Sequence, residues 1–532
     1  FYYTMVTKDA FIGFDFSTQQ LKSVVINKKR EIIYDAVVEF DSDLPEFRTQ
    51  KGVVHSGKNT VNAPVLMWVK ALDMVLERLR ICGADFSKVA ALSGCAQQHG
   101  TVYWAVGAQD VLNCLTYSHF LHTQLASCFS INNSPVWLDT STKIQCEALE
   151  KGVGGSLELA KVTGSRAYER FSAAQISKIC RLKPTAYKNT ERISLVSSFA
   201  CSLFLGRYAP IDYADGSGMN LLDITTRTWS SKCMEFTAPD LGDKLGEPVP
   251  TATCLGNISN YFCERFGFSE ECKIFAFTGD NPSSLAGMSI SGNDIGISLG
   301  TSDTLFVTLD RPVLLSEGHL LISPISCEKF MALICYKNGS LSRERISQIY
   351  TGGNWTEFNK LLESTPRGNF GYIGLYYDVE EIVPNLEGIY RYDRADNSIE
   401  KFPSAEIEIR ALIEGQFLAK RAIIEDLNMN IGESTKVIVS GGASVNETIL
   451  QVISDIFAAP VYKLRYAHSA AFGAAYRAAS CLENLVENLE EEEYDANLLF
   501  VCKPFEDCKQ IYDPMVARFR QIIQNLHLKR NQ

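Results

Sequence analysis

The chain has 532 residues, 46% of them hydrophobic, and a formal net charge of −11 at pH 7. Its length favours two or more domains, because a domain typically has about 150 residues. The acidic balance argues against nucleic acid, because binding to a phosphate backbone needs a basic surface. No apolar run approaches the roughly 20 residues that a membrane span requires, and residues 1–5 turn polar too soon for a signal peptide. We therefore expect neither nucleic acid nor a membrane as partner.

The 16 cysteines are scattered singly, with no C-x-x-C pair. In a chain of this size, that spread fits small, reduced core residues better than a disulfide framework or a zinc site. The pattern favours the cytoplasm.

The first predicted elements are strands over residues 11–40, arranged around a hairpin. Residues 64–81 form a helix with Pro64 in its first turn, where proline is tolerated. A buried strand over residues 89–93 runs into the polar segment 94–100, and residues 136–139 are a second candidate for a strand that ends in polar residues. In α/β proteins, ligands bind just beyond such strand ends.

The segment Gly52-Val53-Val54-His55-Ser56-Gly57-Lys58 matches most of a P-loop, but we reject it. The next residue is Asn59, so the hydroxyl that coordinates Mg²⁺ is missing. No buried strand precedes it either, since residues 43–48 are polar and contain a proline.

The second half shows the same alternation of strands and helices, which argues for an α/β protein. The predicted elements are a helix from residue 193 to a turn at 205–207, a strand at 273–278, a helix at 283–288, a long helix at 405–427 and a strand at 437–440. The four acids at 490–493 are expected to be solvated surface without a function. A domain boundary is expected between residues 286 and 294.

Two segments have nearly the same pattern, Ile12-Gly13-Phe14-Asp15-Phe16-Ser17-Thr18-Gln19 and Ile295-Gly296-Ile297-Ser298-Leu299-Gly300-Thr301-Ser302. Each predicts a β-hairpin with a small-residue turn, whose backbone N–H groups can bind phosphate oxygens. Only the first carries a carboxylate, Asp15, where the second has Ser298. An anion bound by two hairpins, with one acid available for a metal, indicates ATP and Mg²⁺.

Three other positions have both a structural and a functional interpretation. Asp280 lies at a strand end before a helix, where an N-cap aspartate is common, but a phosphoryl-transfer site also needs a base near the γ-phosphate. Gln98 and His99 follow a strand end and can hydrogen-bond to sugar hydroxyls, although a lone histidine is usually structural. Gly441 and Gly442 form either a simple turn or a place where a nucleotide passes close to the backbone.

Eight segments in order carry a resemblance to a known family. They are residues 13–20, 93–100, 163–171, 211–220, 277–282, 298–304, 410–415 and 440–444. Together they make the chain similar, over nearly its whole length, to the FGGY carbohydrate kinases of the actin-like ATPase superfamily. Within that family it closely resembles the animal members that act on xylulose.

The resemblance implies an α/β fold of two ribonuclease H-like domains flanking a cleft. Residues 1–288 would form the sugar-binding domain, with the first hairpin and the catalytic base. Residues 289–532 would form the nucleotide-binding domain.

The resemblance also implies residue roles. Asp280 would be the general base that takes the proton from the terminal hydroxyl of xylulose, which attacks the γ-phosphate of ATP to give xylulose 5-phosphate and ADP. Asp15 would hold Mg²⁺. The sugar would be bound by Gln98, His99, Arg170, Asp280 and Asn281, and the nucleotide by Ser17, Thr18, Gln19, Gly300, Thr301, Ser302, Trp355, Gly441, Gly442 and Asn446.

Two alternatives stay open at this level. One is a kinase for a related ketose or polyol, such as ribulose or glycerol. The other is a sugar-binding protein of the same fold without catalysis, against which the presence of both Asp15 and Asp280 counts. The expected assembly is a monomer or a homodimer.

Overall fold

The computed structural model describes residues 8–432, 434–466, 468–487 and 497–530. The chain divides into two compact units. The first comprises residues 1–289, 310–331 and 468–496, and the second comprises residues 290–309, 332–467 and 497–532. The acidic run at 490–493 lies outside the described residues. Within the described part of the chain, no helix has the length and apolar character needed to cross a membrane.

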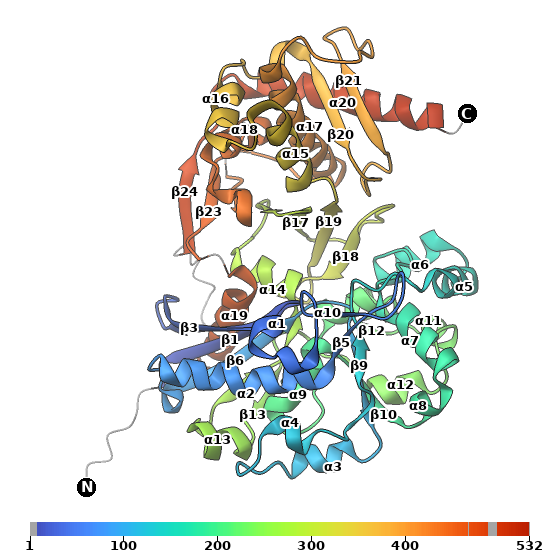
Figure 1. The fold of residues 1–532 in the computed structure, drawn as a ribbon, viewed down its shortest axis with the longest axis vertical. Helices are drawn as coiled ribbons and strands as arrows, with labels where there is room; N and C mark the ends of the chain where they lie inside the picture. The colour runs from blue at the N-terminus through green and yellow to red at the C-terminus, as the bar shows by residue number, and fades with distance from the viewer. Residues whose placement is uncertain (1–7, 433, 467, 488–496, 531–532) are drawn as a thin grey trace. The chain divides into compact units, whose positions relative to one another are not determined.

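This division corrects the predicted domain limits. The chain passes from the first unit to the second between Ser289 and Ile290, beside the predicted boundary at 288/289. Residues 310–331 and 468–496 then return to the first unit, so neither unit is one continuous segment. The physical reason for the second return is helix α19 (Ser469–Glu487), which packs on the sheet of the first unit (Figure 1).

The main sheet of the first unit has the strand order β13-β14-β6-β1-β2-β3, and β15 also pairs with β6. β1, β2 and β3 are antiparallel neighbours, as predicted for residues 11–40, while β6 runs parallel to β1, β14 and β15. The strands are β1 (Ala10–Phe16), β2 (Gln20–Asn27), β3 (Ile32–Glu39), β6 (Val89–Ala96), β13 (Cys254–Asn257), β14 (Lys273–Phe275) and β15 (Thr278–Gly279).

The two faces of this sheet are covered by different helices. Alternate residues of a strand point to opposite faces, and Ile12, Phe14 and Phe16 of β1 enter a core shared with α2 (Val65–Ile81) and α9 (Val196–Leu205). The opposite face of β1 carries Asp15 and lies against α19. The helix predicted for residues 64–81 is therefore confirmed, and most of its apolar residues lie in the core.

Helix α19 also packs against α14 (Asp280–Gly287), the helix that begins with the predicted base. The approach is close, because a Cβ added to Gly473 would lie 1.9 Å from the carbonyl oxygen of Ser283. The Ser283 hydroxyl donates to the Ala470 carbonyl at 2.7 Å. α14 starts three residues before the predicted 283–288 helix, so Asp280 is its first helical residue and Gly279 its N-cap.

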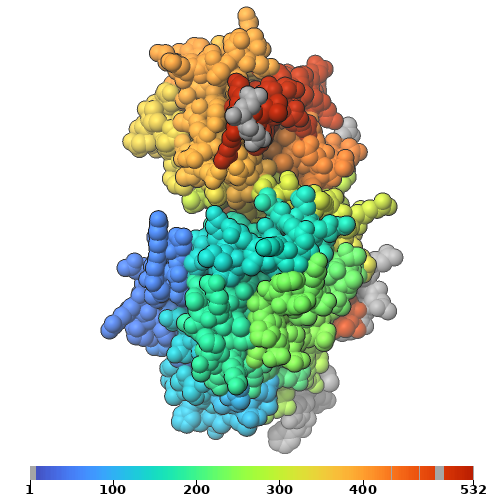
Figure 2. Space-filling model, turned by 90° about the vertical axis from the view of Figure 1, so that its right-hand side faces the viewer, coloured from blue at the N-terminus to red at the C-terminus, as the bar shows by residue number. Residues whose placement is uncertain are grey.

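The rest of the first unit forms smaller sheets and a helical region with its own core. Much of the face turned to the viewer in Figure 2 belongs to this region, in teal and green. Its elements are β7 (Thr101–Ala105), β8 (Phe129–Ile131), α5 (Lys143–Val153), α6 (Ser156–Thr163), α7 (Ser172–Leu182), α8 (Pro184–Lys188), β10 (Thr190–Leu195), α10 (Tyr213–Gly216), β11 (Leu222–Asp223), β12 (Thr228–Trp229), α11 (Ser231–Glu235) and α12 (Leu241–Leu245). Further short elements are α1 (Phe40–Asp43), β4 (Val54–His55), β5 (Val61–Pro64), α3 (Ala108–Asn113), α4 (Leu121–Gln124), β9 (Asn133–Pro135), α13 (Asn260–Phe266) and β18 (His319–Ile322).

One predicted strand is wrong. β9 ends at Pro135, and residues 136–139 form a turn in which the Asp139 N–H donates to the Val136 carbonyl at 2.9 Å. The buried Asp139 carboxylate accepts the Val61 N–H at 3.0 Å and the Gln175 amide at 2.9 Å, and these contacts fix the turn. The rejected P-loop segment forms turns and the short ladder β4–β5, with no phosphate-binding strand–loop–helix.

The second unit repeats the hairpin arrangement. Its strands lie in the order β19-β17-β16-β22-β23-β24, with β16 and β17 antiparallel and β22 parallel to β16. The hairpin predicted at 295–302, the strand at 437–440 and the helix at 405–427 are confirmed. The elements are β16 (Ile295–Leu299), β17 (Asp303–Leu309), β19 (Phe330–Tyr336), α15 (Ser340–Thr351), α16 (Trp355–Glu363), β20 (Ile373–Tyr377), β21 (Gly388–Tyr392), α17 (Ala405–Asp426), β22 (Val437–Ser440), α18 (Glu447–Phe457), β23 (Val461–Leu464), β24 (Leu498–Cys502) and α20 (Cys508–Arg530).

Candidate active site

Three neighbouring strands of the first unit end at the same edge of its sheet. β1 and β15 both pair in parallel with β6, and all three end beside Ala96. The residues that follow these strand ends are therefore neighbours: the first hairpin turn, the pair Gln98 and His99, and Asp280. This is the edge where α/β proteins place their ligands.

Asp15 is a buried carboxylate with one unused oxygen. Its side chain is 5% exposed, and Oδ2 accepts a hydrogen bond from the Ser17 hydroxyl at 2.6 Å. Oδ1 is buried without a hydrogen-bond partner. Burial raises the pKa of Asp15, because the charged form is poorly solvated there.

Asp280 has the properties of a general base. Burial, followed by the negative charge of Asp15, raises the pKa of Asp280 to about 7. Its Oδ1 accepts the N–H of Asn281 at 2.9 Å, whereas Oδ2 accepts no hydrogen bond from the residues that the structure describes. One oxygen is thus fixed by the protein, and the other is available to take a proton from a ligand.

A chain of amides holds Asn281 in place. The Asn281 Nδ2 donates to Gln98 Oε1 at 3.0 Å, and Gln98 Nε2 donates to Asp215 Oδ1 at 3.3 Å. The Ser197 hydroxyl donates to the other oxygen of Asp215 at 2.5 Å. Because protein groups engage the Gln98 amide on both sides, the structure favours a positioning role over the direct sugar contact predicted for this residue.

His99 presents one ring nitrogen as an acceptor. Its Nδ1 lies 2.8 Å from the carbonyl oxygen of Gly218. A carbonyl only accepts, so Nδ1 carries the proton and Nε2 carries a lone pair. Burial is the main cause that lowers the pKa of His99 to about 3, with the charges of His319 and Arg170 adding to it. The ring is therefore neutral at physiological pH.

Arg170 lies in the same neighbourhood, since its charge also lowers the pKa of both His99 and His319. Its guanidinium lies over the Trp137 ring at 5.2 Å and near the Tyr168 ring at 5.5 Å. In the described part of the chain it forms no salt bridge with a carboxylate. The aromatic rings orient the guanidinium and leave its N–H groups for a polar ligand.

The first hairpin turn is tied to this site. The Trp137 indole N–H donates to the Thr18 hydroxyl at 2.8 Å, and Ser17 is bonded to Asp15 as described above. Gln19 is exposed, and its carbonyl accepts the Phe40 N–H at 3.0 Å. The structure therefore brings Asp15, Ser17, Gln98, His99, Asp280 and Asn281 together, with Thr18 and Arg170 both linked to Trp137.

The oxygen donors around Asp15 suit Mg²⁺. A buried carboxylate oxygen without a partner, beside a second carboxylate of raised pKa, would be stabilised by a nearby cation. The described residues contain no group of three or more His, Cys, Asp or Glu that could hold a metal. Mg²⁺ usually takes one or two carboxylates and completes its shell with water and phosphate oxygens.

The second unit brings its own predicted residues together. Gly441 follows β22, and a Cβ added to it would lie 2.5 Å from the Leu299 carbonyl oxygen at the end of β16. Its φ of +85° is in the left-handed region, which favours glycine. Thr301 and Ser302 in the hairpin turn are exposed. The turn and Gly441 thus form one backbone-lined edge within this unit.

A buried ion cluster lies directly after that turn. Asp303 accepts hydrogen bonds from two nitrogens of Arg343 at 2.8 and 2.9 Å, and Lys420 lies 3.1 Å from it. All three side chains are at most 1% exposed. The nearby Ser340 N–H donates to the Gly300 carbonyl at 2.9 Å. These contacts fix the end of the turn before any ligand arrives.

Trp355 and Asn359, the hydrogen-bond partner of Asn446, lie one turn apart on α16. Trp355 begins α16 and is 39% exposed, with its ring 5.0 Å from that of Phe358. Asn359, one helical turn later, accepts the Asn446 amide at 2.9 Å. An exposed indole beside this amide pair is suited to a flat, polar ring.

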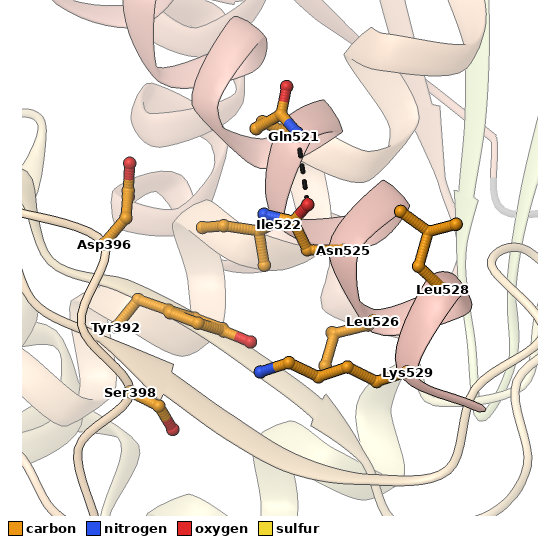
Figure 3. Close-up of a pocket in the computed structure, with 9 residues that line it drawn as sticks. All are labelled: Tyr392, Asp396, Ser398, Gln521, Ile522, Asn525, Leu526, Leu528 and Lys529. Carbon is orange, nitrogen blue, oxygen red and sulfur yellow. Dashed lines mark hydrogen bonds between the residues drawn. The ribbon is translucent and has the colours of Figure 1, made fainter. Parts of the chain in front are cut away.

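A separate pocket of about 300 Å³ lies between the end of α20 and the segment after β21 (Figure 3). Asn525 accepts the Gln521 amide at 3.2 Å on one side, and Tyr392 and Ser398 lie on the other. None of the predicted site residues lines it.

Several residues of the first-unit site have no clear signal in the sequence. Trp137 lies in the segment 136–139, whose apolar pattern predicts a strand, and Asp215 lies in one of the segments that carry the family resemblance. His319 carries no local signal, because it follows Gly318 in a segment without helical or strand periodicity. Its position depends on β18 returning to the first unit.

Known protein families match two long segments of this chain. Models of the N-terminal and C-terminal domains of the FGGY family of carbohydrate kinases match residues 129–287 and 295–482. A relative from Rattus norvegicus, named xylulose kinase, is 52% identical, covering 88% of this chain and 87% of its own.

Solved structures share the fold. A xylulose kinase from Rhodospirillum rubrum superposes with a TM-score of 0.82 at 14% identity, covering 98% of this chain and 100% of that one. A glycerol kinase from Plasmodium falciparum with ADP gives 0.73 at 14% identity and covers 98% of both chains. One fold thus serves enzymes named for different substrates. Family models and relative together show that this chain belongs to the FGGY family of carbohydrate kinases.

Proposed function

We propose that this protein is a xylulokinase, which transfers the γ-phosphoryl group of ATP to D-xylulose and forms D-xylulose 5-phosphate and ADP. The observation that carries the proposal is the Asp280 carboxylate, with one oxygen fixed by Asn281 and the other unengaged. The names of relatives at up to 52% identity support xylulose as the substrate.

The residues of the first unit would act on the sugar. Asp280 Oδ2 accepts the proton of the terminal hydroxyl as that oxygen attacks phosphorus. His99 Nε2 accepts a hydrogen bond from another hydroxyl, and Arg170 and Asn281 donate to sugar oxygens. A sugar hydroxyl is a weak nucleophile, so its orientation supplies much of the rate.

The residues of the second unit would bind the nucleotide. The backbone of Gly300, Thr301 and Ser302 donates to phosphate oxygens, Gly441 and Gly442 leave room for a close approach, and Trp355 with Asn446 lies against the base. Ser17, Thr18 and Gln19 offer a second turn of the same kind. Mg²⁺ held by Asp15 would neutralise phosphate charge during transfer.

The proposal also covers the cellular location, the assembly and the ligands of the protein. No two cysteines form a disulfide bond among the residues that the structure describes, which suits the reducing cytoplasm. We expect a monomer or a homodimer that takes a ketopentose and ATP as its ligands.

The deciding experiment measures ADP release with D-xylulose, L-xylulose, D-ribulose and glycerol side by side. D-Xylulose should give the highest kcat/KM. A higher value for D-ribulose or glycerol would assign the neighbouring kinase activity instead. Saturable sugar binding without any sugar-dependent ADP release would leave the catalytically silent binding protein.

We expect the two hairpins to respond differently to Mg²⁺. Asp15→Asn keeps the size of the side chain but removes its charge, so the Mg²⁺ concentration for half-maximal activity should rise and turnover should fall. Ser298→Ala, at the matching position of the second hairpin, should leave that concentration nearly unchanged. Activity titrated against Mg²⁺ at fixed ATP tests this, and equal responses of the two variants would refute the divergence of the hairpins.

We also expect activity to fall on the acid side. The pKa of Asp280 is raised to about 7, so its protonated form, which cannot act as a base, accumulates as pH falls. A cation at Asp15 offsets part of the charge that causes this shift, which places the midpoint at or below about pH 7. A profile of kcat at saturating Mg²⁺ and ATP measures it, and a rate that stays constant down to about pH 5 would contradict the assignment.

A further inference from the structure

Strand β18 brings His319 into the first unit from a distant part of the sequence. The Leu320 N–H donates to the Gly164 carbonyl at 2.9 Å, and the Ile322 N–H donates to the Ser217 hydroxyl at 3.1 Å. Both bonds are made by residues that follow His319 directly, and they fix the backbone of the strand that carries it. In Figure 1, β18 lies next to α10, which agrees with the contacts between these two elements.

The His319 ring and the His99 ring pack against the same aromatic residue. Both rings pack against Phe171, with ring centroids 4.3 Å away for His99 and 4.9 Å away for His319. Tyr168 lies 5.5 Å from His319 and also contacts Arg170. The two histidines therefore lie on one aromatic surface, beside the same guanidinium.

The hydrogen bonds leave one nitrogen of His319 unused. Nδ1 lies 3.1 Å from the Ser165 hydroxyl, and Nε2 has no partner among the described residues. Burial, with the charge of Arg170, lowers the pKa of His319 to about 4, so the ring is neutral. When the Ser165 hydroxyl donates to Nδ1, the proton resides on Nε2, which then becomes a donor.

We propose that His319 is a second histidine that contacts the sugar, with its Nε2 donating a hydrogen bond to a hydroxyl oxygen of the substrate. This inference rests on the proposed sugar-kinase function. His99 offers an acceptor and His319 a donor, and a sugar hydroxyl both donates and accepts. The pair can therefore select polyhydroxylated ligands by the positions of their hydroxyls, which makes His319 a specificity-determining residue.

Two substitutions separate sugar contact from structural support. In His319→Asn the amide reaches the Nδ1 position and can still bond to Ser165, but nothing reaches the Nε2 position. In His319→Gln the amide reaches the Nε2 position. We expect His319→Asn to raise KM for D-xylulose about tenfold, the usual worth of one hydrogen bond in a ligand site, with a smaller change in kcat. His319→Gln should restore part of the affinity.

Deoxy analogues of D-xylulose identify the contacted hydroxyl. The analogue that lacks it should bind the parent protein more weakly and lose nothing further in His319→Asn, while the other analogues lose the same factor as D-xylulose. His122→Asn is the matched control, since the His122 ring packs 5.7 Å from that of Phe120 and contacts none of the site residues named here. It should leave KM unchanged.

The outcomes are distinct. An equal rise of KM for every analogue, or an unchanged KM in His319→Asn with intact folding, would overturn the contact. Parent protein without activity on any sugar would refute the proposed function instead. In that case, the shift of the unfolding temperature with added D-xylulose, compared between parent and His319→Asn, still tests the contact: a smaller shift in the variant supports it, and an equal shift overturns it.

Discussion

Asp280→Asn should reduce turnover by about 10²–10⁴, the usual contribution of general acid–base catalysis. An amide of the same shape keeps the acceptor at Oδ1 for the Asn281 N–H but cannot take a proton from a hydroxyl. Measured at saturating D-xylulose and ATP, the loss should appear mainly in kcat. Near-normal turnover in a folded variant would remove Asp280 from the role of base.

The same substitution should make the free protein more stable. The pKa of Asp280 is about 7 in the folded state, above the value of about 3.9 in an unfolded chain, so folding binds a proton between these values. The stability from this proton is fully present below about pH 4 and is lost as pH rises through about 7. The unfolding temperature of Asp280→Asn should therefore exceed that of the parent most clearly above pH 7, and the difference should shrink in acid.

Asp73→Asn is the matched control. Asp73 is 4% exposed, and burial raises its pKa to about 6, but its carboxylate accepts hydrogen bonds from the Leu121 N–H and the Tyr261 hydroxyl, away from the site. Turnover per folded molecule should not change. A loss comparable to that of Asp280→Asn would point to a general effect of buried charge rather than to base catalysis.

Gly473→Ala should destabilise the first unit and also reduce activity. The new Cβ would lie 1.9 Å from the Ser283 carbonyl oxygen and 2.8 Å from the Gly287 nitrogen, both backbone atoms that cannot rotate away. α19 and α14 must then separate, with a cost of about 1–3 kcal/mol, typical of overpacking. Because α14 begins at Asp280, the displacement should lower kcat as well.

The control for this change is Gly57→Ala, where the added Cβ meets only the Thr60 side chain at 3.8 Å. Thermal unfolding and turnover should both stay at the parent values. If Gly473→Ala lowered the unfolding temperature but left kcat intact, α19 would support the fold without positioning the base.

The sequence was most informative where the pattern is local. The three strands around the first hairpin, the helices at 64–81 and 405–427 and the strand at 437–440 follow from apolar periodicity and turn residues, and the structure has them. The strand predicted for residues 136–139 is absent, although Val136-Trp137-Leu138 is as apolar as a strand. Their conformation is set by the partners of Asp139 from distant segments, which no local pattern records.

The site residues, too, are predictable where the signal is local and unpredictable where it depends on distant segments. Asp15, His99 and Asp280 could be predicted because each lies at a strand end or just after one, and parallel pairing with β6 then brings them together. The position of His319 could not be predicted. It depends on hydrogen bonds that Leu320 and Ile322 donate to Gly164 and Ser217, which are distant in the sequence. The close approach of Gly473 to α14 was hidden too, as glycine in a small-residue helix gives no sign of its neighbour.

The late position of α19 in the chain has a consequence for biosynthesis. The ribosome completes β1, β6 and α14 long before it makes residues 469–487, yet these elements bury their surfaces against that helix. Until then, one face of the sheet, with Gly13 and Asp15, has no helix to cover it and is open to other chains or to chaperones. Most strands of the second unit are made before α19, but its last strand and helix, β24 and α20, follow α19 in the chain. The part of the molecule that carries the proposed catalytic carboxylates is therefore expected to reach its native packing late, although it is the first to be synthesised.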